Sequence, residues 1–205
     1  MEIDKIDNVI QNLKEMLLER GDNIDEFDEH EVEVDREYFY NDNRVTDFHT
    51  SDTAIIFALT KPLRTNIIDT FKKNKNNLEG LVKEFNGKWK IILIFNNDLL
   101  TTPSITQLNI IDKLLQKEGG MLQYFQIKEL LFNPTKHQYV PPHRKLSKDE
   151  STKIMDKYLV KKLQLPIILH TDVIAKWLGL KQGDIVEIIR YNENSGKCYY
   201  YRCCI

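Results

Sequence analysis

The apolar run at residues 88–95 (KWKIILIF) constrains the fold of this chain more than any other segment. It has the length of a β-strand and is far too short to span a bilayer. A continuous apolar run of this length is typical of a strand that is covered on both faces, as in a parallel sheet. Residues 53–59 (TAIIFAL) have the same character, and segments with helical periodicity follow both runs. This alternation predicts a mixed α/β (α+β) fold.

Further apolar patterns continue the alternation along the chain. Apolar residues recur at helical spacing over residues 3–20, where Gly21 marks the expected end. They recur again over residues 64–84, where the basic run 72–75 leaves open one helix or two short ones. The other predicted helices cover residues 106–116, 147–162 and 173–178, and the other predicted strands cover residues 32–39, 122–127, 185–191 and 197–205. The polar residues 41–53 are expected to form a loop.

A segment with two adjacent prolines divides the chain. Residues 135–142 (TKHQYVPP) cannot continue a helix, because proline lacks the backbone N–H and restricts the residue before it. The sequence therefore predicts two domains, residues 1–134 and residues 135–205. The second is expected to be a small α/β domain that ends in a hairpin.

Local signals mark the elements of the second domain. Ser147 and Glu150 have the spacing of a capping box and should begin its first helix. Asp172 is a suitable N-cap for a short helix, and Gly179 is the expected glycine after its last turn. The closing hairpin is expected to turn at residues 192–196.

The charge balance and the cysteines limit the class of protein. The formal net charge is -2 and the pI is about 6.2, whereas a stand-alone nucleic-acid binder usually carries a basic excess. Contact with DNA would therefore need a local basic patch or a partner. The sequence begins without a secretory signal and has no membrane-spanning run, so no membrane partner is expected. Three cysteines near residue 200 do not make a disulfide framework, which favours a reducing compartment.

No set of residues has the pattern of a catalytic or metal site. The acidic run at residues 25–35 lacks the glycine and the ligand spacing of a calcium-binding loop. The cysteines together with His137 and His143 lack the spacing of a zinc site, which favours structural cysteines. Asp184 and Glu187 are spaced like nuclease ligands, but no lysine follows them at the required position. We therefore expect no cofactor, no metal and no catalytic residue.

Two groups of basic residues are open to two interpretations. The first group consists of Lys61, Arg64, Lys72, Lys73 and Lys75, and the second lies between residues 136 and 162. Solvent-exposed helix faces are the default interpretation of both groups. Contact with a DNA backbone is the more specific interpretation, and it is proposed for the first group.

A continuous series of motif residues runs through the C-terminal third. Its members are Val140, Pro141, His143, Leu146, Ser147, Asp149, Glu150, Tyr158, Lys161, Gln164, Leu165, Pro166, Asp172, Trp177, Leu178, Gly179, Leu180, Lys181, Gly183, Asp184, Val186, Ile188, Ile189, Arg190, Ser195, Gly196, Tyr201, Arg202 and Cys204. In order and spacing this series resembles the assembly domain of the small RNA polymerase subunit that eukaryotes share across their nuclear polymerases and that has a counterpart in archaea. Trp177 stands where the family has tyrosine, and Ile167 and His170 stand where it often has basic residues.

The resemblance implies a non-catalytic polymerase subunit. The family's assembly domain docks on the largest polymerase subunit, which makes that subunit and the other polymerase subunits the expected partners. In the N-terminal part, Thr102, Pro103 and Ser104 resemble the family's T-P-S-A segment. In eukaryotic members an N-terminal jaw domain helps to grip downstream duplex DNA, so residues 1–134 are expected to be that jaw.

Other functions and two sources remain open at the level of sequence. A free-standing transcription regulator or adaptor that reuses the assembly fold is the main alternative, and a metal-dependent nuclease is the third. The divergent jaw and the abundance of Asn, Lys and Ile favour a copy encoded by a large cytoplasmic DNA virus, with a divergent protist as the rival. A viral copy would work in the host cytoplasm and could be packaged in the virion, whereas a cellular one would work in the nucleus.

Overall fold

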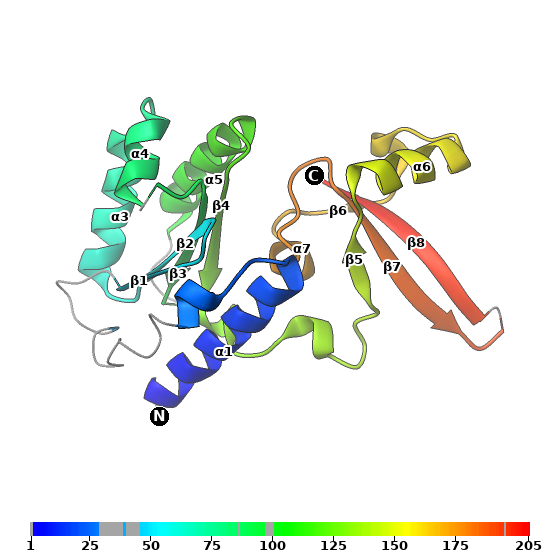
Figure 1. Cartoon of the computed structure of the whole chain (residues 1–205), viewed down its shortest axis with the longest axis horizontal. Helices are drawn as coiled ribbons and strands as arrows, with labels where there is room; N and C mark the ends of the chain where they lie inside the picture. The colour runs from blue at the N-terminus through cyan, green and yellow to red at the C-terminus, as the bar shows by residue number, and fades with distance from the viewer. Residues whose placement is uncertain (1, 29–38, 40–45, 86, 97–100, 195) are drawn as a thin grey trace. The chain divides into compact units, whose positions relative to one another are not determined.

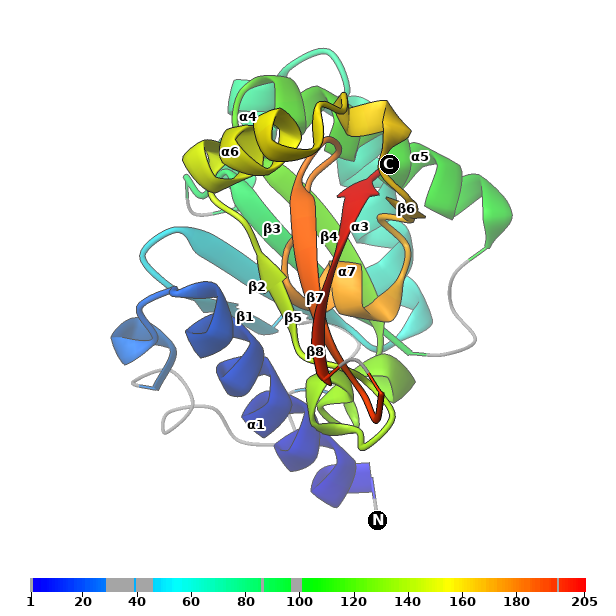
Figure 2. The ribbon, with the colours of Figure 1, turned by 90° about the vertical axis from the view of Figure 1, so that its right-hand side faces the viewer.

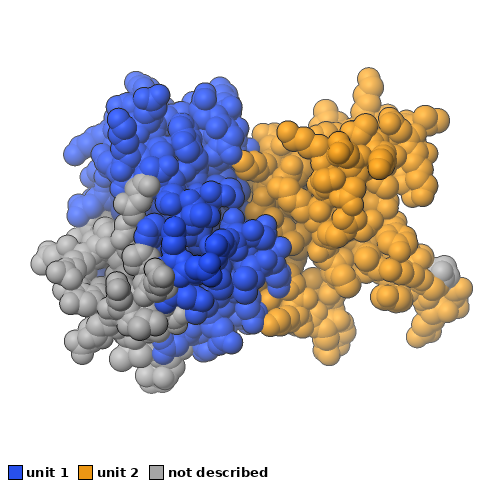
Figure 3. All heavy atoms as spheres, in the orientation of Figure 1, with its two compact units in different colours: residues 1–132 blue, residues 133–205 orange. Residues whose placement is uncertain are grey.

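The computed structural model describes residues 2–28, 39, 46–85, 87–96, 101–194 and 196–205. The chain divides into two compact units, Met1–Phe132 and Asn133–Ile205, and the division falls two residues before the boundary expected from the sequence (Figure 3). Each unit is described by itself. No helix in the described ranges is both long enough and apolar enough to cross a membrane.

The N-terminal unit is built on a four-stranded sheet with the strand order β1-β2-β3-β4 (Figure 1). Its strands are β1 (Thr46–His49), β2 (Thr53–Ala58), β3 (Lys90–Phe95) and β4 (Met121–Gln126). β1 and β2 are antiparallel, whereas β2, β3 and β4 are parallel. The strand predicted at residues 88–95 is confirmed as β3, and every residue from Ile91 to Phe95 is buried, as expected of a strand covered on both faces.

Helices cover both faces of this sheet (Figure 2). One face packs against α3 (Lys61–Lys73), α4 (Leu78–Glu84) and α5 (Thr102–Lys117), which contribute the buried Phe71, Leu81 and Leu115 to a common core with the strands. The other face is covered by α1 (Glu2–Arg20). Its half-buried Arg20 donates a hydrogen bond of 2.7 Å to the Oε1 atom of Gln123 on β4, and desolvation by the surrounding protein lowers the pKa of Arg20 to about 10.

Several expectations for the N-terminal unit are corrected. Residues 46–49, predicted as loop, form β1. In residues 61–84, where the sequence leaves one helix or two short ones open, the structure has two, and the first begins at Lys61 instead of residue 64, with a proline in its first turn. α5 begins at Thr102 rather than at residue 106, again with a proline in its first turn. The predicted strand at residues 32–39 lies outside the described residues except for the buried Phe39.

The C-terminal unit is a second four-stranded sheet, ordered β5-β7-β8-β6. Its elements are β5 (His143–Lys145), α6 (Lys148–Tyr158), β6 (Ile167–Ile168), α7 (Val173–Trp177), β7 (Ile185–Asn192) and β8 (Gly196–Cys204), with 3₁₀ turns at Ile127–Leu130 before the unit and at Pro134–Lys136 and Lys162–Gln164 within it. β7 is antiparallel to β5 and β8, and β6 is parallel to β8. One face packs against α7 through Ile168, Ala175, Leu180, Val186, Ile188 and Cys204.

The capping residues predicted for this unit are confirmed, but one helix end is not. Ser147 Oγ accepts from Glu150 N at 3.2 Å and Glu150 Oε2 accepts from Ser147 N at 2.8 Å, which completes the capping box. α6 ends at Tyr158 instead of residue 162, because Leu159 adopts the left-handed conformation with φ of 51°. The sequence does not predict β5, since its three residues, HRK, carry no apolar alternation.

Candidate subunit-docking surface

Many of the motif residues build the turns of the C-terminal unit. Asp172 Oδ1 accepts from Ile174 N at 2.8 Å and begins α7, after which Gly179 adopts φ of 61°. Asp184 Oδ2 accepts from Lys181 N at 2.8 Å and closes the turn that leads into β7, where Gly183 has φ of 88°. These residues therefore determine the conformation of the turns, and they need not contact a partner themselves.

Other motif residues lie along the strands or beside them. Leu146 is buried, Leu178 is packed against the core and Leu165 is half-buried. Gln164 accepts from Lys161 N at 2.7 Å in the 3₁₀ turn that precedes β6, and Pro166 O accepts from Cys203 N at 2.8 Å. Gly196, with φ of 69°, opens β8, and Ser195 lies outside the described residues.

An ion-pair network joins α6 to the sheet. Arg144 of β5 lies 2.7 Å from Glu150 on α6 and 3.1 Å from Glu187 on β7. The Ser147 backbone N–H and the Arg144 side chain lower the pKa of Glu150 to about 2. Tyr201 Oη donates to Glu187 at 3.3 Å, and burial together with the nearby carboxylate raises the pKa of Tyr201 to about 12. The network fixes one face of the β7–β8 hairpin.

Replacing Arg144 by alanine is expected to raise the pKa of Glu150 toward its ordinary value. Only part of the shift should disappear, because the bond from the Ser147 backbone remains. A titration of the Glu150 carboxyl by NMR measures the effect, and Arg144→Lys serves as the control that keeps a cation. An unchanged pKa in the alanine variant would contradict the assigned cause.

The two acids that are spaced like nuclease ligands both form ion pairs within the C-terminal unit. Lys145 Nζ lies 2.6 Å from Asp184 Oδ2, and Glu187 binds Arg144 and Tyr201. Across the described residues, no three His, Cys, Asp or Glu side chains are grouped as a metal site. Cys203 and Cys204 are buried in the sheet, and burial raises the pKa of Cys204 to about 11. The acids stabilise a turn and a strand pair.

The opposite face of the hairpin carries arginines. Alternation along the strands places Arg190 and Arg202 on the same face as Tyr200, and the Arg190 guanidinium lies 5.0 Å from the Tyr200 ring centroid. His143 is nearby, with its Nδ1 atom 2.5 Å from Pro141 O. Burial lowers the pKa of His143. This face carries the core residues Val186, Ile188 and Cys204, and beyond them it is cationic and aromatic.

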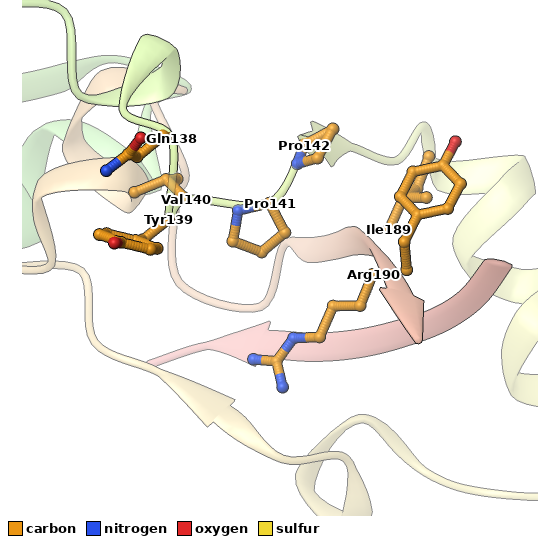
Figure 4. A pocket seen from close by; sticks show the side chains of 8 residues that line it. Gln138, Tyr139, Val140, Pro141, Pro142, Ile189 and Arg190 are labelled. Atoms are coloured by element: carbon orange, nitrogen blue, oxygen red, sulfur yellow. The ribbon is translucent and has the colours of Figure 1, made fainter. Parts of the chain in front are cut away.

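A groove lies where the proline segment meets the hairpin (Figure 4). It has a volume of about 460 Å³ and is lined by residues 138–142 and by Ile189, Arg190 and Tyr191. The motif residues Val140 and Pro141 are among its walls, and Tyr139 and Tyr191 are 81% and 76% exposed. Exposed apolar side chains continue over the unit, namely Leu159, Leu163, Ile167, Leu169, Tyr199 and Tyr200. Such a surface is typical of a protein interface.

The structure separates the five basic residues of the first group. Lys61 and Arg64 lie in the first turn of α3, and Lys72 and Lys73 lie in its last turn, with Lys75 just beyond. Since α3 has 13 residues, its two ends are about 18 Å apart. Lys72 also pairs with Asp69 at 3.2 Å. The group is therefore two basic sites rather than one.

Residues 132–204 match the family RNA polymerase Rpb5, C-terminal domain. The chain is 39% identical over 90 residues to subunit rpabc1 of DNA-directed RNA polymerases I, II and III from Dictyostelium discoideum, which covers 44% of this chain and 46% of that protein. It is 38% identical over 82 residues to the subunit RPABC1 from Caenorhabditis briggsae, which covers 40% of this chain and 39% of that protein. The matched part thus spans less than half the length of these relatives.

Proposed function

We propose that this chain is a non-catalytic subunit of a multisubunit DNA-directed RNA polymerase, because residues 132–204 belong to the Rpb5 C-terminal domain family. Residues 133–205 would dock on the largest polymerase subunit, and nucleotidyl transfer would belong to the large subunits. The observation that carries the proposal is the family match over nearly the whole C-terminal unit, whose surface offers an interface and whose paired acids are engaged in structural contacts.

The N-terminal unit is proposed to be a jaw that contacts downstream duplex DNA. β2 and β3 are parallel, so α3 and α5, which follow them, both begin at the carboxyl edge of the sheet. Helix N-termini favour phosphate groups, and Lys61 and Arg64 add positive charge at the start of α3. The segment Thr102-Pro103-Ser104 forms the first turn of α5. These features support this edge as the DNA-facing one.

A co-purification experiment tests the proposed function. A tagged full-length chain, expressed in cells of its source organism, should recover the two largest polymerase subunits in equal molar amounts. The isolated N-terminal unit, tagged in the same way, is the matched control and should recover neither. Recovery of the full chain only as a free monomer from transcribing cells would contradict the proposal.

Charge reversal of Lys61 and Arg64 is expected to weaken the grip on DNA in the assembled polymerase. Two lost phosphate contacts should reduce the slope of log K against log salt concentration by about 2. The Lys72→Glu/Lys73→Glu double variant, with the same change of charge at the other end of α3, is the control and should alter the slope less. Equal slopes for both double variants would place the DNA elsewhere.

A free-standing transcription regulator is the second candidate, and one observation favours it. The family match leaves residues 1–131 uncovered, so the N-terminal unit could serve another purpose. Such a regulator would associate with polymerase in less than equal molar amounts, and quantitative mass spectrometry of purified polymerase separates the two functions.

The named relatives come from cellular eukaryotes, which supports work in the nucleus for a cellular copy. A source in a large DNA virus, with action in the host cytoplasm, stays a prediction from composition. Localisation of the tagged chain in its native cells distinguishes the two.

A further inference from the structure

Strand β8 (Gly196–Cys204) pairs with another strand along almost its whole length on one side, but only at its C-terminal end on the other. β7 pairs with it from Gly196 to Cys203, but β6 pairs with only Cys203 and Cys204. Figure 2 shows β6 beside the end of β8 that lies near the C-terminus. Within the described part of the chain, no strand borders residues 197–202 on that side.

The backbone groups along this open side point outward. Ile189 N donates to Pro142 O at 3.0 Å, so it faces β5, and its cross-strand partner Tyr199 therefore faces away from β7. Cys203 N donates to Pro166 O at 2.8 Å and follows the same alternation. Tyr199 and Tyr201 consequently present their N–H and C=O groups to the open side.

Pro166 prevents the chain from covering this edge itself. In the parallel register of Ile167 with Cys203, the donor opposite the Tyr201 carbonyl would be the nitrogen of residue 166. Proline carries no N–H, so β6 cannot extend in that direction. The 3₁₀ turn Lys162–Gln164 also directs the preceding chain out of an extended conformation. The motif residue Pro166 therefore limits β6 at its N-terminal end and leaves the edge of β8 at residues 197–202 available.

The side chains beside the edge indicate the chemistry of what would bind there. On one face, Tyr200 is 48% exposed and lies under the Arg190 guanidinium, with Arg202 on the same face. On the other face, Tyr199 is 47% exposed and the Lys197 Nζ atom lies 5.2 Å from its ring centroid. An acid of the hairpin, Glu187, already binds Arg144 and Tyr201. Aromatic rings with cations on both faces complement apolar and acidic side chains.

We propose that an extended segment of a partner protein, carrying acidic residues among apolar ones, adds as a strand to β8 beside residues 197–202. The added strand would continue the row that β6 begins, and its backbone would pair with Tyr199 and Tyr201. Main-chain hydrogen bonds would provide affinity, while the arginine and lysine side chains would select acidic residues. That the partner is another polymerase subunit rests on the proposed function.

The variants Tyr199→Pro and Tyr199→Ala separate the backbone contact from the side chain. Both remove the ring, but only proline removes the N–H that faces the open side, and this N–H does not bond to β7. Incorporation of the full-length chain into polymerase should fall about tenfold further for proline than for alanine, as expected when a buried acceptor on the partner is left unpaired. Thermal unfolding of both free variants, followed by circular dichroism, controls for damage to the hairpin.

Hydrogen exchange tests the same edge in the unaltered chain. The amides of Tyr199 and Tyr201 should exchange fast in the free chain and slowly in the assembled polymerase, whereas those of Cys198 and Tyr200 should be slow in both. Fast exchange of the Tyr199 and Tyr201 amides in the assembled polymerase would overturn the added strand and leave the proposed function intact. Equal incorporation of the Tyr199→Pro and Tyr199→Ala variants would do the same. A wild-type chain that never enters polymerase overturns the proposed function and its choice of partner. Slow exchange in a free chain that sediments as a dimer overturns the proposal in favour of a second copy.

Discussion

Replacing Trp177 by alanine is expected to lower the free energy of unfolding of the C-terminal unit by about 3–5 kcal/mol. Trp177 is 1% exposed and is the largest fully buried side chain among the described residues. α7 has only five residues, too few to be stable without packing, so its position depends on this side chain. Urea unfolding of the full chain, followed by circular dichroism, measures the loss, and incorporation into polymerase should fall with it.

Trp177→Tyr is the matched control for this experiment. It keeps an aromatic ring at a position where the resembled family has tyrosine, so it should cost much less than alanine. A C-terminal transition that is equally stable in the wild type and the alanine variant would show that α7 does not hold the unit together.

Replacing Phe57 by alanine is expected to destabilise the N-terminal unit by a similar amount, about 3–5 kcal/mol. Phe57 is 1% exposed, and its ring centroid lies 4.8 Å from that of Phe39 and 5.6 Å from that of Phe48. The cavity would therefore open inside an aromatic cluster on the α1 side of the sheet. The measurement is the same urea unfolding, with Phe57→Leu as a control that retains most of the buried volume.

The two large core substitutions also test whether the units are independent. Phe57→Ala should leave the transition of the C-terminal unit in place and, under the proposed function, should allow the chain to enter polymerase while impairing its grip on DNA. If the C-terminal transition shifts as far as the N-terminal one, the two units unfold together, and docking cannot be assigned to residues 133–205 alone.

Elements with strong local signals could be predicted from the sequence. The apolar run at residues 88–95 contains β3, the periodic residues 3–20 contain most of α1, and the capping box of Ser147 and Glu150 begins α6. In each case one short pattern determines the element. The end of α6 could not be predicted, because the helical pattern continues past Leu159, which leaves the helix in a conformation that leucine rarely adopts.

Elements that depend on distant partners could not be predicted in the same way. β1 and β5 are edge strands of four and three residues, and their pairing with β2 and β7 defines them more than their own composition does. The apolar pattern places the start of α5 four residues late because Thr102, Pro103 and Ser104 are not apolar, although proline suits a first helical turn.

The candidate site shows the same division. The motif residues could be identified individually, and the turns of Asp172 and Gly179 follow from known capping chemistry. The open edge of β8 could not be identified, since it depends on the register of β6 against β8 and on the position of Pro166 within that register. Cross-strand register is set by the whole sheet rather than by one segment.

The left-handed residue that ends α6 has a consequence for the stability of the free chain. Glycine adopts that conformation freely, whereas leucine loses about 1–2 kcal/mol in it. The chain nevertheless keeps at position 159 a leucine whose side chain is 91% exposed. Glycine would relieve this strain, so the exposed side chain of Leu159 lies on the surface of the C-terminal unit at a cost to the stability of the free chain.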